Sequence, residues 1–516
     1  MANHFNAPDL CSQIEVSGPG FLNLLLSNTF LAQQLQPLIQ DHRLGLAKIS
    51  STSPIIVEYG SPNVAKEMHV GHLRSAVIGD AIARTLDYLG HQVIRQNHIG
   101  DWGTQFGMLI EYLLETNWDL TKEHTISEAN IAYKQAKQRF DADPRFANQA
   151  REKVVALQSG DPTVLKIWQR LVNESKKHFQ EVYQRLGVLL HEEDIRGESF
   201  YNPMLPDIVK ELLSAGIATH DQGAVTVFLS GFVDRDNQPL PFIIQKSDGG
   251  YLYGTTDLAA AKFRAQQLKA KRIIYVVDAR QAQHFGMLFA TIKKTAWADE
   301  DVIFEHAAFG TVLGTDRKPF KTRSGESIQL TSLLDEAEKR ARDVVDEKST
   351  LSEDQKAAIA KIVGIGALKY ADLSTDKVKD YVFDWDRMLS FEGNTAPYLQ
   401  NAYVRIQAIF RKGDIQRADL TNQSITVNDP HERKLALVLL EFSDIVHQVA
   451  DELAPHRLCT YLFELAATFH KFYEACPVLT TADEATRNSR LLFCELTART
   501  LQLGLSLLGI GVLERM

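Results

Sequence analysis

Hydrophobic positions near residue 55 change from a strand pattern to a helical one. The run at residues 55–59 is almost continuously apolar, which is typical of a strand buried in a sheet. A helix is predicted next, because apolar residues recur at helical spacing until Gly90: Leu73, Ala76, Val77, Ala81, Leu86 and Leu89. Val93 and Ile94 then begin a second strand. The pattern predicts a strand-helix-strand unit of the length that nucleotide-binding sheets use.

The region after this unit favours a helical insertion within a parallel sheet. Residues 110–200 are charged and mostly helical in pattern, with interruptions at Asp143-Pro144 and Asp161-Pro162. Strand-like runs return at residues 224–229 and 242–244. Residues 272–277 have the continuous apolar character of a central parallel strand, and a helix is expected from about His284 to Trp297. We therefore expect a parallel sheet that the insertion splits in sequence.

From about residue 330 the pattern is helical throughout. Two apolar stripes at helical spacing predict a bundle. One comprises Leu435, Val438, Leu439, Phe442, Ile445, Val446 and Val449, and the other Leu462, Leu465, Ala466, Phe469, Phe472 and Tyr473. At the opposite end of the chain, residues 1–50 predict one short apolar strand at 21–26 and one helix, as part of a small domain.

Composition narrows the class of protein without deciding its function. The 516 residues are 45% hydrophobic and 23% charged, as in ordinary globular proteins. The net charge of −9 argues against indiscriminate coating of nucleic acid, although a local basic face for RNA remains open. The first residues show no secretion signal, and the longest apolar stretch, near residues 501–513, is too short to span a bilayer. Four scattered cysteines predict a reduced, cytoplasmic protein without a cysteine-built zinc site.

Candidate phosphate chemistry begins where the first strand meets its helix. His69 and His72 flank Gly71 at this turn. Backbone N–H groups and the dipole at a helix start favour an anion, imidazoles can donate to phosphate oxygens, and glycine lets a flat base approach. The residues alone leave two alternatives open, namely a metal-binding pair and a simple cap of a surface turn.

A second cationic segment follows the last sheet strands. Residues 318–325 carry Lys318, Lys321 and Arg323 on a loop that ends in Gly325. Such a loop can supply positive charge where phosphate charge develops, although an isolated basic run is often a solvated surface loop.

Together these segments resemble the class I aminoacyl-tRNA synthetases. Residues 69–72 match the first signature of that class, and residues 318–325 occupy the place of its lysine-rich second signature in a degenerate form, Phe320-Lys321-Thr322-Arg323-Ser324. Residues 58–66, 100–107, 394–400 and 514–516 are similar to the arginyl-tRNA synthetases in particular, so the resemblance covers almost the whole chain.

The resemblance implies an α/β fold with three parts. Residues 51–385 would form a Rossmann-like catalytic domain with a helical insertion at about 110–200 and a stem at about 330–385. Residues 386–516 would form an all-α anticodon-binding bundle, and residues 1–50 a remnant of a small α+β N-terminal domain. Arginyl enzymes usually carry a fuller N-terminal domain that contacts the tRNA elbow, so either the start is truncated or the domain is reduced.

The resemblance also implies a site for ATP and arginine. His69, Gly71, His72 and Lys321 would bind ATP, and Lys66 would supply a compensating cation. A guanidinium needs carboxylates and other acceptors, and the residues implied for arginine are Glu58, Asp257, Tyr253, Asn63 and Gln281. By itself, Tyr253 could equally be a core aromatic residue and Asp257 a helix cap.

The expected reaction is ATP-dependent ligation of L-arginine to its tRNA through an arginyl-adenylate. ATP with Mg²⁺ would be a substrate, with no tightly bound metal or organic cofactor, and activation would depend on tRNA. Tyr473 and Met516 are the implied tRNA contacts, although Tyr473 could be core. A monomer without membrane contact is expected. The competing interpretations are a tRNA-binding paralogue without catalysis and a class I synthetase for another amino acid.

Overall fold

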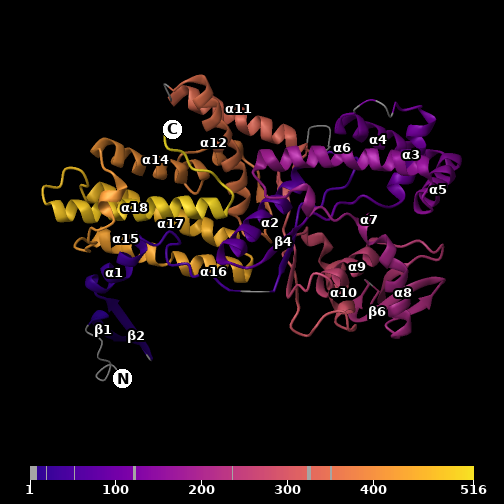
Figure 1. Cartoon of the computed structure of the whole chain (residues 1–516), viewed down its shortest axis with the longest axis horizontal. Coiled ribbons are helices and arrows are strands. Elements are labelled where there is room, and N and C mark those ends of the chain that lie inside the picture. The colour runs from indigo at the N-terminus through magenta and orange to yellow at the C-terminus, as the bar shows by residue number, and fades with distance from the viewer. Residues whose placement is uncertain are drawn as a thin grey trace.

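The computed structural model describes residues 9–18, 20–50, 53–119, 122, 124–234, 236–321, 327–348 and 351–516. Figure 1 shows the C-terminal helices on one side of α2 and the charged helical insertion on the other, so α2 lies near the middle of the molecule. Within the described residues, no helix combines the length and apolar character that crossing a membrane requires.

The central sheet is parallel throughout. Its strands are β3 (Ile55–Glu58), β4 (Val93–Gln96), β8 (Arg272–Tyr275) and β9 (Ile303–His306), in the spatial order β4-β3-β8-β9. Ile55 pairs with Val93 on one side and Arg272 on the other, so β3 and β8 are neighbours despite the insertion between them in sequence. The chain order reverses direction between β3 and β8, and ligands of open α/β sheets bind outside the strand ends at such a point.

Helix α2 (Val70–Leu89) connects β3 to β4 and ends where the sequence predicted. Gly90 adopts a left-handed conformation with φ of 101°, which glycine enters without a Cβ penalty. All six residues of the predicted apolar face are buried. The helix also contacts α12, α16, α17 and α18, so it is covered by the C-terminal half of the chain.

The insertion is helical, as predicted. It contains α3 (Thr104–Glu115), α4 (Ile126–Ala142), α5 (Pro144–Gln158) and α6 (Pro162–Leu186). Asp143 and Asp161 cap α5 and α6 through their carboxylates, and the proline after each occupies the first helical position. The two Asp-Pro interruptions are therefore helix starts, because proline is well tolerated there and aspartate is a strong N-cap.

A second, antiparallel sheet flanks the insertion in sequence. Strands β5 (Ala218–Asp221), β6 (Ala224–Val233) and β7 (Pro239–Gln245) lie in the order β5-β6-β7. The runs at 224–229 and 242–244 are thus strands, but they belong to this small sheet and not to the parallel one. Helices α7 (Glu198–Tyr201), α8 (Leu205–Ser214), α9 (Tyr253–Gln266) and α10 (Ala282–Ile292) complete this part.

The C-terminal half comprises a stem and a bundle. The stem contains β10 (Val312–Leu313), α11 (Leu330–Lys348), α12 (Glu353–Leu373), β11 (Tyr381–Val382) and α13 (Trp385–Met388), with β10 and β11 paired in parallel. The bundle contains α14 (Ala396–Gly413), α15 (Pro430–Leu440), α16 (Phe442–Glu452), α17 (Pro455–Ala475) and α18 (Glu484–Leu507). The predicted stripes are buried except for two members: Ile445 is partly exposed and Tyr473 is 37% exposed.

The N-terminal segment contains one strand more than the sequence indicated. A hairpin of β1 (Cys11–Ser17) and β2 (Phe21–Leu26) precedes α1 (Asn28–Leu35). The first strand was missed although residues 13–17 alternate between polar and apolar types, a pattern that is typical of a half-buried strand. Helix α1 packs against α15, and the Gln36 Nε2 donates to the Gln423 carbonyl at 3.0 Å. The fold class is confirmed: a parallel α/β sheet with a helical insertion, followed by an all-α bundle.

Candidate active site

The histidine turn is held by its own backbone. His69 is the N-cap of α2, and its Nδ1 accepts from the Gly71 N–H at 3.1 Å. The His72 Nδ1 accepts from the His69 N–H at 3.0 Å. Since both Nδ1 atoms are acceptors, each neutral ring carries its proton on Nε2. The rings lie 4.0 Å apart between centroids, so the turn presents two neighbouring N–H donors at a helix N-terminus.

Electrostatics keep these rings uncharged. Burial lowers the pKa of His72 to about 3, and the neighbouring His69 and Lys66 add to that effect. Burial also lowers the pKa of His69, followed by the repulsion of Lys66 and Arg280. Lys66 therefore lies near both rings, and its ammonium lies 4.5 Å from the centre of the Tyr133 ring in α4. The turn can stabilise phosphate charge by neutral donors beside one cation.

Gly71 has a packing reason that the sequence did not reveal. A Cβ at this position would lie 2.9 Å from Cε1 of His69, closer than real contacts allow. The glycine thus permits the ring to fold back on the backbone N–H. The approach of a flat base to Gly71 stays a prediction, and the residue is exposed as that prediction requires.

The segment after the basic loop joins the histidine turn directly. The Val70 N–H donates to the Ile328 carbonyl, and the Leu330 N–H donates to the Met68 carbonyl, each at 2.9 Å. Lys321 forms a β-bridge with Ser327, so the loop returns to this segment. Residues 322–326, which include Thr322, Arg323 and Ser324 of the degenerate signature and Gly325 of the same loop, lie outside the described residues. Two sequence segments that are far apart therefore meet at the start of α2.

Lys318 and Lys321 also line a cavity of about 860 Å³. Its wall includes Arg340 and the stacked rings of Phe320 and Phe383, whose centroids lie 4.5 Å apart. The lysines thus flank an open, aromatic-lined space beside the loop, which is consistent with a ligand-facing role for the segment.

Asp257 lies between two histidines. Its Oδ2 lies 2.6 Å from the Nε2 of His284 in α10, and its Oδ1 lies 3.7 Å from the Nε2 of His98. Helix α9 begins at Tyr253, so Asp257 is more than one turn inside the helix and does not cap it. The alternative of a helix cap is therefore wrong. Tyr253 is 63% exposed, which excludes the core-aromatic alternative as well.

Glu58 has a partner within the chain. Parallel register places Gln96, Glu58 and Tyr275 side by side across three strands. The fully buried Arg264 of α9 lies across this row: its guanidinium forms an ion pair with Glu58, donates to the Gln96 Oε1 at 2.6 Å and lies 5.1 Å from the centre of the Tyr275 ring. Arg264 therefore neutralises the charge of Glu58 within the chain. A direct contact of Glu58 with substrate stays a prediction.

Asn63 and Gln281 are exposed and lie on opposite sides of the point between β3 and β8 where the strand order reverses, which we call the switch point. A Cβ on Gly100 would lie 2.3 Å from the Asn63 Oδ1, so that glycine makes room for the amide. Gln281 is the N-cap residue of α10, three positions before His284. Both follow strands of the central sheet, β3 and β8 respectively, so their side chains start at the same edge.

Two further acidic side chains in this region, Glu198 and Asp101, were not predicted as site residues from the sequence. Glu198 has its pKa raised to about 8, first by burial and then by the nearby Asp257 and Asp101. Asp101 accepts from the Ser199 N–H at 2.8 Å and from its hydroxyl at 2.7 Å, and burial raises the pKa of Asp101. The position of Asp101 after β4 was the available signal, whereas Glu198 follows the insertion and needed the tertiary structure. With its pKa raised to about 8, Glu198 is mostly protonated at neutral pH, so it contributes a hydrogen-bonding group to this region and not a full negative charge.

The two implied tRNA contacts lie in different environments. Tyr473 stacks on Phe469 of α17 and keeps its exposed side outside the bundle core. Met516 is partly buried and packs against a hydrophobic cluster of α11 and α12 that includes Val345 and Val363. Tyr473 is therefore not a core residue, and an RNA contact by either residue stays a prediction.

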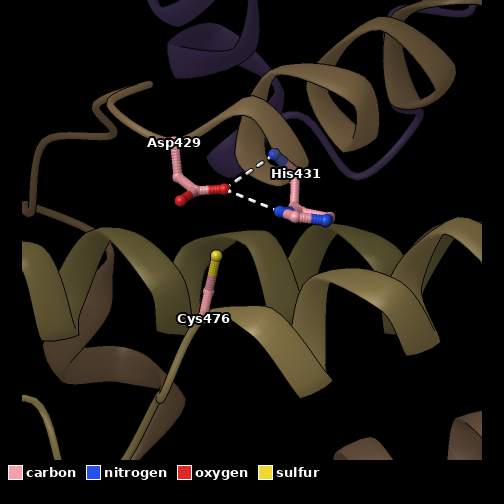
Figure 2. Close-up of side chains that lie close together, drawn as sticks. All are labelled: Asp429, His431 and Cys476. Carbon is pink, nitrogen blue, oxygen red and sulfur yellow. Dashed lines mark hydrogen bonds and ion pairs between the residues drawn. The ribbon is translucent and has the colours of Figure 1, made fainter.

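Among the described residues, one group of side chains outside this region has metal-ligating chemistry. Figure 2 shows Asp429 and His431 at the start of α15 and Cys476 directly after the end of α17. The Asp429 Oδ1 accepts from the His431 N–H at 2.8 Å and lies 2.9 Å from the His431 Nδ1. Asp429 is the N-cap of α15, so helix capping explains its position. The positive end of a helix dipole also disfavours a cation there.

Comparisons with known proteins agree with this geometry. Residues 34–385 match the family described as tRNA synthetases class I (R), catalytic domain, and residues 399–516 match the DALR anticodon binding domain. The chain is 50% identical over 524 residues to an arginine–tRNA ligase of Synechococcus elongatus, covering 100% of this chain and 89% of that protein. An arginine–tRNA ligase of Chromobacterium violaceum is 50% identical over 508 residues, covering 98% of this chain and 88% of its own length.

Solved structures give the same family. The arginyl-tRNA synthetase of Plasmodium falciparum superposes with a TM-score of 0.85 at 32% identity, covering 100% of this chain and 87% of that one. That of Thermus thermophilus gives 0.82 at 27% identity, with 100% and 90% covered. The matched domains span both halves of the chain, and the similarity to these relatives is nearly full length. The chain therefore belongs to the arginyl-tRNA synthetase family of class I aminoacyl-tRNA synthetases.

Proposed function

We propose that the protein ligates L-arginine to its tRNA in two steps, with ATP as the energy source. The observation that carries the proposal is that two kinds of binding group lie at the same switch point of the parallel sheet. Neutral imidazole donors occupy the start of α2, and Asp257 lies near the buried carboxyl group of Glu198 beyond the ends of β4 and β8. The first suits a triphosphate and the second a guanidinium.

In the first step, the arginine carboxylate attacks the α-phosphorus of Mg-ATP in line and releases pyrophosphate. The Nε2–H groups of His69 and His72, with Lys66 and Lys321, stabilise the shifting phosphate charge. Gly71 accommodates the nucleotide. No covalent bond to the enzyme forms, because the substrate carboxylate is itself the nucleophile.

Selection of arginine rests on acceptors for a planar fork of donors. Asp257 receives the guanidinium, Tyr253 covers it, Glu58 adds to the acceptor set, and Asn63 and Gln281 hold the α-amino and carboxylate end. Lysine offers a point charge and leaves acceptors arranged for paired N–H groups partly unsatisfied, which costs affinity.

In the second step, a terminal ribose hydroxyl of the tRNA attacks the arginyl-adenylate, giving arginyl-tRNA and AMP. The α14–α18 bundle binds the anticodon region, with Tyr473 and Met516 as contacts. The protein acts in the cytoplasm as a monomer and holds no tightly bound metal or organic cofactor.

The test is pyrophosphate exchange and tRNA charging with each amino acid, with and without arginine tRNA. We expect exchange that depends on both arginine and tRNA. Faster exchange with another amino acid would contradict the assignment. Tight tRNA binding without exchange or charging would instead support a binding paralogue.

A further inference from the structure

We propose that His284 is a positioning residue for arginine: it holds one oxygen of Asp257 and the Tyr253 ring, and leaves the other Asp257 oxygen for the substrate guanidinium. This inference rests on the proposed function. It assigns to α10 a role in arginine recognition that is separate from that of Gln281 at the start of the same helix.

The two oxygens of Asp257 have different surroundings. His284 Nε2 lies 2.6 Å from Oδ2, which is a short hydrogen bond to a carboxylate. His98 Nε2 lies 3.7 Å from Oδ1, beyond hydrogen-bond length. Only the first contact fixes the rotamer of Asp257. Oδ1 therefore keeps acceptor capacity for one N–H of a guanidinium.

The same imidazole also contacts Tyr253. The two ring centroids lie 4.9 Å apart, and Tyr253 is 63% exposed, so His284 supplies a neighbour for an otherwise open ring. Phe242 of β7 and Phe285 enclose His284 from other sides, with centroids at 5.8 Å and 5.3 Å. The His284 side chain is only 11% exposed, so it is itself held in place.

The test compares two variants that separate the hydrogen bond from the packing. His284→Phe keeps an aromatic ring against Tyr253 and removes the N–H donor, and His284→Gln keeps a donor and removes the ring. His220→Phe, at an exposed position on β5, is the matched control. Charging of tRNA is measured with arginine, ATP and tRNA varied in turn, at one fixed pH.

We expect His284→Phe to raise the arginine KM about 10- to 100-fold, since a hydrogen bond to a charged group is lost, with the ATP KM unchanged. His284→Gln keeps a donor for Asp257 and should restore most of the loss. An unchanged arginine KM in His284→Phe, equal rises for arginine and ATP, or no recovery in His284→Gln would each overturn the inference.

The proposed function fails separately, if the wild-type protein shows no arginine-dependent charging. If His284→Phe does not fold, as judged by circular dichroism, His284→Ala, which also lacks the donor, takes its place, and an unchanged arginine KM in that variant overturns the inference.

Discussion

The two halves of the candidate site are built in different ways. At the phosphate half, His69 and His72 are held by backbone N–H groups within three residues of themselves. At the arginine half, Asp257 and Glu58 are held by side chains from other elements, His284 of α10 and Arg264 of α9. The first half is local chemistry, and the second depends on the packing of helices against the sheet.

This difference explains why the two halves tolerate different changes. A histidine ring that is hydrogen-bonded within its own turn needs only the start of α2 to form. A buried carboxylate needs a partner from elsewhere in the chain, because burying an unpaired charge is unfavourable. We expect changes at the arginine half to affect stability as well as recognition, and changes at the phosphate half to affect mainly the rate of adenylation.

The largest expected effect is on stability, at Arg264. The change Arg264→Met leaves Glu58 buried at 6% exposure without its ionic partner. We expect the free energy of unfolding to fall by about 3–5 kcal/mol, as when one member of a buried pair is removed. Denaturation in urea, followed by circular dichroism, measures the change.

The matched control removes both charges. The double variant Glu58→Gln with Arg264→Met should recover much of the lost stability, because no unpaired charge remains. A loss below about 1 kcal/mol in the single variant would show that the arginine half does not depend on this pair.

A large kinetic effect is expected at the phosphate half. His72→Ala removes a neutral donor and the acceptor of the His69 N–H. We expect adenylation to slow by about 100- to 1,000-fold with the arginine KM nearly unchanged, as on losing a preorganised donor to developing charge. Single-turnover measurement of arginyl-adenylate formation in the presence of tRNA tests this. Full turnover in the variant would show that the ring has only a capping role.

The mirror change at the arginine half is Asp257→Ala. It should raise the arginine KM about 10- to 100-fold while leaving the ATP KM nearly constant, because a charged hydrogen bond to the guanidinium is lost. Steady-state charging with each substrate varied measures both constants. Similar rises in the two KM values would show that Asp257 supports the structure of the whole site, and the distinction between the two halves would then be wrong.

The smallest effect is a pH dependence of stability from His72. Its pKa is lowered to about 3 in the folded state, from about 6.5 in the unfolded chain, so the unfolded state alone takes up the proton between these values. Stability from this ring is present above pH 6.5 and falls as the pH falls toward 3. Between pH 7 and 5.5 the loss is about 1 kcal/mol. Wild type and His72→Asn, compared in urea at both pH values, should differ by this amount, and identical slopes would contradict it.

Much of the fold was predictable because its signals are local. The strand at β3, the helix α2 with its end at Gly90, and the helical insertion follow from periodicity and from the requirement for positive φ at a helix end. Strands β5, β9, β10 and β11 were missed, since each has only two to four residues, too few for a periodic signal. The hairpin strand β1 was missed although residues 13–17 alternate between polar and apolar types.

The site was predictable in its residue types and less so in its partners. The resemblance supplied Glu58 and Asp257, but neither Arg264 nor His284, which lie far from them in sequence or only meet them through packing. Glu198 shows the same limit. Its displaced pKa comes from burial and from Asp257 and Asp101, and no spacing in the sequence brings these three carboxyl groups together.

The sequence by itself determined that a strand is followed by a helix that begins at two histidines. The residue types within about a dozen positions specify the strand, the helix cap and the hydrogen-bond donors there. It also supplied the basic loop and the acidic residues as separate candidates. Only the tertiary structure decided how they meet: residues 328–330 pair with the backbone of residues 68–70, and the parallel register lays Gln96, Glu58 and Tyr275 under Arg264. Long-range hydrogen bonds and burial determine those partners, and the local periodicity of the sequence predicts neither.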